Sequence, residues 1–173
     1  MLLMKRHYII LLIAFTFCTN ISVFGQINIL QLQIDSLKYL RQNTFDCNSV
    51  TWRIIANKNY AIQPLIDRLD DTTMTAAKDK CKKTNFRVGD LAYLTLTKIL
   101  PIPFYTITGL QNNVTKDECQ GKVFEYIEMN REKFKAQVQA YYNKKSDKLK
   151  WVPIHSNHLT PCQRKNNVKG RYE

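Results

Sequence analysis

The residues best suited to chemistry in this sequence are His155, His158 and Cys162, in the pattern His-x-x-His-x-x-x-Cys. Histidines three residues apart could face one ion, and a cysteine thiolate is a good zinc ligand. Only three ligands are present, however, and Pro153 and Pro161 interrupt any continuous helix through them. We therefore expect no metal and no cofactor, and we interpret the segment as a polar loop with two exposed histidines.

Other catalytic arrangements have weaker support. No cysteine lies in a recognisable catalytic signature, and the adjacent carboxylates Asp70 and Asp71 would point apart on a helix. The chain has no Gly-x-Ser-x-Gly, no P-loop and no dinucleotide fingerprint. The enzymatic alternative is a small periplasmic hydrolase or metal-dependent enzyme in which His155 or His158 meets a carboxylate such as Asp90.

The first 25 residues are typical of a cleavable export signal. Lys5 and Arg6 form a positive region before the apolar run from Ile9 to Phe17, and we expect cleavage near Gly25 and Gln26. An alternative is an N-terminal membrane anchor. Phe17 stands where a lipoprotein signal would need a small residue before Cys18, which disfavours lipidation. Residues 26–173 would then form a single domain.

The cysteines after the signal favour disulfide bonds. An even number remains, with three possible connectivities, and an oxidising compartment would preserve the bonds. We favour Cys47–Cys81, because it would tie a long loop to the start of the preceding helix. Buried free thiols are the alternative. The four candidates are Cys47, Cys81, Cys119 and Cys162.

A basic excess is the strongest indication of a partner. The formal net charge is +12, or +10 without residues 1–25, and residues 143–173 hold eight basic and two acidic residues. We expect a protein or an anionic envelope component, such as a glycan or lipid headgroup, and we do not expect nucleic acid. A basic run can also serve solubility alone. The predicted binding surface comprises Lys82, Lys83, Arg87, Trp151, Arg164 and Lys165.

Apolar periodicity predicts mostly helices to position these residues. We expect helices over 27–42, 50–55, 59–71, 88–99 and 122–142, with Pro64 in a first turn and a strand as the alternative for 88–99. Residues 72–86 are interpreted as a loop and 104–108 as a short extended segment. The helix over 122–142 should have a solvated outer face with local Glu128–Arg131 and Glu132–Lys135 pairs. Thr160 and Pro161 could start a short final helix.

Two of these helices carry a recognisable repeat pattern. Ala61, Ile62, Leu65, Ile66 and Leu69 precede Asp71, and Val88, Ala92, Leu96 and Ile99 follow the loop. Together they resemble the two helices of a HEAT-type repeat. Gly89 replaces the arginine usual after the valine, and residues 72–86 replace the usual short turn. The resemblance implies an all-α, HEAT-like hairpin bundle, here with a long C-terminal helix and an irregular basic tail.

The segments VGDLAYLTL, FEYIE and RKNNVKGRYE resemble small exported proteins of Bacteroidota of unassigned function. This resemblance implies a family but no activity. We therefore predict a non-enzymatic binding or interaction module, in which residues 72–86 and the basic segment line one surface. An envelope-structural or inhibitor role, dependent on disulfide rigidity, is a further alternative.

Overall fold

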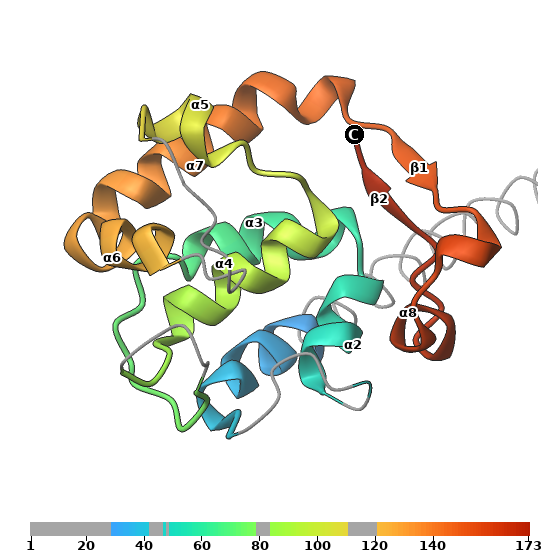
Figure 1. Ribbon diagram of the computed structural model, residues 1–173, viewed down its shortest axis with the longest axis horizontal. Helices are drawn as coiled ribbons and strands as arrows, with labels where there is room; N and C mark the ends of the chain where they lie inside the picture. The colour runs from blue at the N-terminus through green and yellow to red at the C-terminus, as the bar shows by residue number, and fades with distance from the viewer. Residues whose placement is uncertain (1–28, 42–46, 48, 79–83, 111–120) are drawn as a thin grey trace, which may run out of the picture. The chain divides into compact units, whose positions relative to one another are not determined.

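Figure 1 shows the chain in a computed structural model, which describes residues 29–41, 47, 49–78, 84–110 and 121–173. The chain divides into two compact units, Met1–Leu32 and Gln33–Glu173. In the first unit the described residues, 29–32, are helical. All the elements below belong to the second unit. Within the described ranges, no helix is long and apolar enough to cross a membrane.

The second unit is mostly helical, as the sequence predicted. In chain order its elements are η1 (Ser36–Tyr39), α2 (Val50–Ala56), α3 (Asn59–Asp67), α4 (Val88–Ile99), α5 (Phe104–Thr108), α6 (Gly121–Met129), α7 (Arg131–Lys145), η2 (Ser146–Lys148), β1 (Trp151–Pro153), η3 (Ser156–His158), α8 (Pro161–Lys165) and β2 (Gly170–Tyr172).

The hairpin of α3 and α4 forms the centre of this unit, and the two helices pack against each other. Its apolar positions are all buried, which confirms the predicted core and excludes a strand over 88–99: Ala61, Ile62, Leu65, Ile66, Leu69, Val88, Ala92, Leu96 and Ile99. Removal of these side chains from water is the main force that holds the two helices together. The resemblance of the hairpin to a HEAT-type repeat stays a prediction.

Pro64 lies in the middle of α3, so its predicted place in a first turn is wrong. A proline there cannot donate a hydrogen bond to the carbonyl of Tyr60, four residues earlier. Tyr60 is 70 % exposed, so water can reach this side of the helix. The helix is held by the burial of its opposite face, which offsets the missing bond.

The connection between α3 and α4 is a loop, as predicted, but a paired one. The N–H of Thr75 donates to the carbonyl of Phe86 (2.9 Å), and the N–H of Val88 donates to that of Thr73 (2.9 Å). A bridge between Met74 and Arg87 lies between these bonds. The two arms of the loop therefore form a short antiparallel ladder that leads directly into α4. Residues 79–83 lie outside the described part.

Residues 104–108 form helix α5, so the predicted extended segment is wrong. The buried ring of Phe104 lies 5.7 Å from that of Tyr126 and 6.0 Å from that of Phe134, between centroids. These aromatic contacts with α6 and α7 outweigh the β-propensity of the sequence. Tyr93 joins the same cluster through Phe134, and burial raises the pKa of Tyr93 to about 12.

The predicted long C-terminal helix is confirmed as α7, but its predicted span, 122–142, is broken at Asn130 into α6 and α7. The side-chain amide of Asn130 donates to the carbonyl of Tyr126 (3.1 Å), while its own carbonyl accepts from the N–H of Phe134 (2.7 Å). One residue thus ends α6 and starts α7. The break redirects α7, whose first residue, Arg131, is buried.

The C-terminal segment is ordered and not an irregular tail. Strands β1 and β2 pair antiparallel, with Trp151 opposite Tyr172 and Val152 opposite Arg171. The predicted start of a final helix is confirmed, since Thr160 caps α8 and exchanges hydrogen bonds with Gln163. The long sequence separation of the two strands hid this pairing from local patterns.

Candidate functional site

A buried ion pair occupies the junction of the central hairpin with α7. Nη2 of Arg131 lies 3.0 Å from Oδ1 of Asp90, and their side chains are only 7 % and 0 % exposed. The other Asp90 oxygen accepts from the backbone N–H of Arg87 (2.9 Å). Arg131 therefore pairs with Asp90 and not, as predicted, with Glu128, which contacts Arg87. Both oxygens of Asp90 are thus engaged by groups of the protein, and its side chain has no exposure to solvent.

Gly89 makes room for this arginine. A Cβ atom at Gly89 would lie 2.4 Å from the carbonyl oxygen of Leu69 and 2.9 Å from Nη1 of Arg131. The arginine of the repeat pattern is missing at Gly89, and a guanidinium from α7 occupies the space beside it. In the described part of the chain, Nη1 of Arg131 is a buried nitrogen without a hydrogen-bond partner.

Cys47 is bonded to Cys162, so the favoured Cys47–Cys81 pair is wrong. The disulfide joins the segment before α2 to α8 across 115 residues of sequence. Asn166 strengthens the same junction, because its side-chain amide donates to the carbonyls of both Cys47 and Cys162 (2.9 Å each). Cys81 and Cys119 lie outside the described residues.

The disulfide also removes Cys162 as a thiolate ligand beside His155 and His158. Both histidines are exposed around η3, whereas Asp90 is fully buried. The structure therefore does not bring either histidine to Asp90. No group of three or more potential His, Cys, Asp or Glu ligands gathers anywhere in the described ranges.

The two C-terminal strands and their flanks form a surface that we call the basic ribbon, residues 150–154 and 169–173. Its inner face holds Trp151 and Tyr172, whose rings meet edge to face at 5.1 Å. Nζ of Lys58, which precedes α3, lies 4.9 Å from the centroid of Trp151. A Cβ at Gly170 would lie 2.4 Å from Nε1 of Trp151, so this glycine lets the indole lie across β2.

Tyr172 connects the ribbon to the start of α3. Burial raises the pKa of Tyr172, a hydrogen bond with the backbone of Asn59 opposes this rise, and the nearby Tyr142 and Tyr60 add to it. The Tyr172 ring also contacts Trp151, so this aromatic pair lies next to the start of α3. Tyr60, in the first turn of α3, is 70 % exposed.

The outer face of the basic ribbon is charged. Successive side chains of a strand point to opposite faces, so the register places Lys150, Val152 and Arg171 on the face opposite Trp151. Lys169 has the same parity as Arg171, and both basic residues are exposed. Arg171 also pairs with Glu173, at 2.7 Å between Nη2 and Oε1. The ribbon thus presents positive charge to solvent on a fixed backbone.

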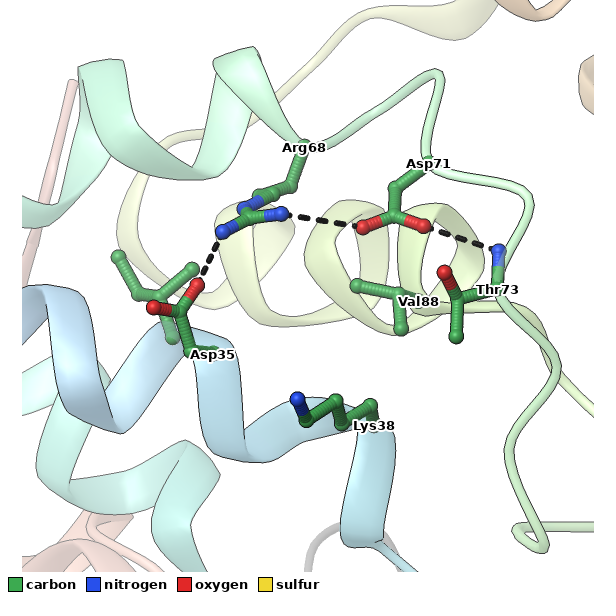
Figure 2. Close-up of a pocket in the computed structure, with 7 residues that line it drawn as sticks. Asp35, Lys38, Arg68, Asp71, Thr73 and Val88 are labelled. Carbon is green, nitrogen blue, oxygen red and sulfur yellow. Dashed lines mark hydrogen bonds and ion pairs between the residues drawn. The ribbon is translucent and has the colours of Figure 1, made fainter.

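A separate polar pocket of about 320 Å³ lies between η1 and the end of α3 (Figure 2). Its lining residues come from the η1 region, the α3–α4 connection and the start of α4: Ile34, Asp35, Lys38, Arg68, Asp71, Thr73 and Val88. Arg68 bridges the two aspartates, with an ion pair to Asp35 and a 3.2 Å contact between Nη1 and Oδ2 of Asp71.

Asp71 is held as a carboxylate in this pocket. Desolvation alone would raise its pKa, but hydrogen bonds from the side chain and backbone of Thr73 and the charge of Arg68 together hold the pKa below its ordinary value of 3.8. Lys38 lies along the pocket with its Nζ 4.8 Å from the ring of Tyr39. It makes no ion pair with any residue that the structure describes.

The described residues of the predicted binding surface lie on different elements. Arg87 contacts the carbonyl of Thr72 (3.1 Å) and Oε1 of Glu128 (3.2 Å) at the start of α4. Trp151 lies in the basic ribbon, and Arg164 and Lys165 are exposed on α8. The structure does not bring Arg87 together with Trp151. Lys82 and Lys83 lie outside the described residues.

Sequence reasoning did not find the pocket or the contact of Lys58 with Trp151. Asp35 and Lys38 precede Arg68 and Asp71 by 30 residues or more, so no local spacing joins them. The one usable signal was Asp71 at the end of the hairpin motif. Lys58 has a positive φ of 53°, which is uncommon for a residue with a side chain and is visible only in the structure.

In comparisons with known proteins, the chain matches no family model, no curated protein and no solved structure.

Proposed function

We propose that this protein is an exported, non-enzymatic binding module whose basic ribbon binds an anionic polysaccharide. Export is supported by the residues 1–25 pattern and by the Cys47–Cys162 disulfide, since disulfides persist mainly in oxidising compartments. A binding role is supported by the placement of the candidate catalytic groups, because Asp90 is fully buried and Cys162 is oxidised.

The observation that carries the proposal is the two-faced ribbon. Lys150, Lys169 and Arg171 are exposed on one face, while Trp151 and Tyr172 pack on the other beside Lys58. The disulfide and the inner aromatic contacts fix the backbone that carries the charges. A preorganised row of cations loses less conformational entropy on binding than a mobile basic tail.

The ribbon favours a glycan over the other polyanions. An amphipathic membrane-binding element needs a broad apolar face, whereas Val152 is only 38 % exposed on the outer face. Nucleic acid is a less accessible partner outside the cytoplasm. Tyr60, exposed in the first turn of α3, offers a ring on which the apolar face of a sugar can stack. A sugar that bears a carboxylate has both an apolar face for stacking and the negative charge that the basic ribbon requires.

The test is binding of the purified protein to immobilised polygalacturonate, with neutral dextran as the uncharged polymer. The triple variant Lys150→Gln, Lys169→Gln, Arg171→Gln should weaken binding by about tenfold or more, because each exposed contact contributes up to about 1 kcal/mol. The matched control, Lys122→Gln, Lys133→Gln, Arg53→Gln, removes the same charge from exposed positions on other elements and should retain the affinity.

Three outcomes would reject the proposal. Equal losses in the two triple variants would mean that net charge alone drives adsorption. If the protein bound neutral dextran as strongly as polygalacturonate, the carboxylates of the polymer would have no role in binding. Tighter binding to duplex DNA or to phosphatidylserine vesicles than to polygalacturonate, at the same salt concentration, would assign the ribbon to another class of partner.

A further inference from the structure

The pocket beside η1 has unused hydrogen-bond donors. Arg68 commits two of its five N–H groups to Asp35 and Asp71. The ammonium of Lys38 lies 4.8 Å from the centroid of the Tyr39 ring and forms no ion pair among the described residues. Each aspartate already accepts from Arg68, and Asp71 also accepts from the N–H of Thr73 at 2.9 Å. The remaining capacity therefore suits a ligand that accepts hydrogen bonds.

The charges limit the kind of acceptor. Two cations, Lys38 and Arg68, share the lining with two carboxylates, so the pocket is formally neutral. A polyanion would be repelled by Asp35 and Asp71, whereas one negative charge can be placed beside the Lys38 ammonium. Apolar side chains of Ile34 and Val88 complete the wall, and Val88 lies in Figure 2 below the Arg68–Asp71 pair.

We propose that this pocket binds a small monocarboxylate with a short apolar tail. The carboxylate accepts hydrogen bonds from Lys38 and from the free edge of Arg68, and the tail contacts Ile34 and Val88. The volume of about 320 Å³ lies at the small end of the range for ligand pockets. This site is separate from the basic ribbon and does not depend on the polysaccharide proposal.

The test is an amide ¹H–¹⁵N titration of the full protein with butyrate, and with butyramide as a neutral molecule of the same shape. Butyrate should give saturable shifts at residues of η1 and the Arg68–Thr73 turn, in the millimolar range expected for so small a ligand. Lys38→Gln should weaken binding about fivefold or more, because a charge-assisted hydrogen bond is lost. Lys38 is exposed, so the variant should fold.

Lys133→Gln is the matched control, since it removes an exposed lysine from α7 and should leave the butyrate affinity unchanged. Equal binding of butyrate and butyramide would overturn the proposal, as would unchanged affinity in Lys38→Gln. Shifts that concentrate at residues 150–154 and 169–173 would also overturn it, because they would assign the carboxylate to the basic ribbon. If the unmutated protein shows no butyrate-induced shifts at the pocket residues but still binds polygalacturonate, this site is rejected and the proposed function stays intact.

Discussion

The central hairpin and the basic ribbon are stabilised in different ways. In the hairpin, both apolar faces are buried and the junction with α7 encloses the Arg131–Asp90 pair. In the C-terminal region, Leu159 and Val168 are the main buried apolar residues, while most neighbours are exposed. A disulfide and a short aromatic contact hold this second region.

The difference shows how one small unit can combine a stable core with an exposed charged surface. Burial of apolar area stabilises a helix pair but leaves no room for a row of solvated cations. A crosslink instead limits the conformations of the unfolded chain and requires little burial. We therefore expect changes in the hairpin to lower global stability through lost burial, and loss of the disulfide to loosen the ribbon in addition to lowering global stability.

The largest effect is expected for Arg131→Met. This change leaves the Asp90 carboxylate buried without its cation, and loss of one partner of a buried pair costs about 3 to 5 kcal/mol. Urea unfolding monitored by circular dichroism would measure the loss. Arg53→Met, at an exposed position of α2, is the control and should change stability little. A loss below about 1 kcal/mol would mean that the pair is not essential to the core.

The next effect is expected for Cys162→Ser. Loss of a disulfide that closes a loop of 115 residues typically costs about 2 to 4 kcal/mol. Hydrogen exchange should show faster exchange at β1 and β2 than in the intact protein, with a smaller change in α4. Uniform acceleration across α4 and the ribbon would contradict the separation of the two regions, because it would show one cooperative unit.

Gly89→Ala tests the close approach of Arg131 to the hairpin. Helix propensity alone would make this change stabilising by about 0.5 to 1 kcal/mol. The contacts of 2.4 Å and 2.9 Å that a Cβ would make reverse the sign, and we expect a destabilisation of about 1 to 3 kcal/mol. The sign of the change in thermal midpoint decides the result. A more stable variant would show that α4 can shift freely against Leu69 and Arg131.

The smallest effect is expected from protonation of Asp71. Its folded pKa is lowered, so its stabilisation is complete above the unfolded value of 3.8 and is lost as the pH falls through the folded value. Because the group is partly exposed, the contribution should be below about 1 kcal/mol. Urea midpoints between pH 3 and pH 6 should fall less steeply for Asp71→Asn than for the parent. Identical profiles would show that the Arg68 and Thr73 contacts contribute no net stabilisation.

Local patterns predicted the parts of the fold that depend on neighbours in the sequence. The period of Ile62, Leu65, Ile66 and Leu69 identified a buried helix face. Thr160 and Pro161 identified a helix start. Local reasoning was wrong at 104–108 and at Asn130, because contacts of Phe104 and Arg131 with distant residues overrode local propensity.

The candidate sites depended more strongly on tertiary contacts. Arg87 and Trp151, both predicted for one surface, lie on different parts of the chain, since Arg87 precedes α4 and Trp151 is in β1, whereas Lys58 contacts Trp151 from just before α3. The pocket joins residues of η1 to Arg68 and Asp71. Spacing left the cysteine connectivity open, and only the approach of α8 to Cys47 identified the Cys47–Cys162 bond.

By itself, the sequence determined the helical class, the apolar faces of the hairpin and the excess of positive charge, since periodicity and composition act within each segment. The tertiary structure decided which charge is buried, which cysteines pair and which cations share a surface. These choices depend on chain segments up to 115 residues apart. Their relative free energies arise from burial and geometry that no short sequence window contains.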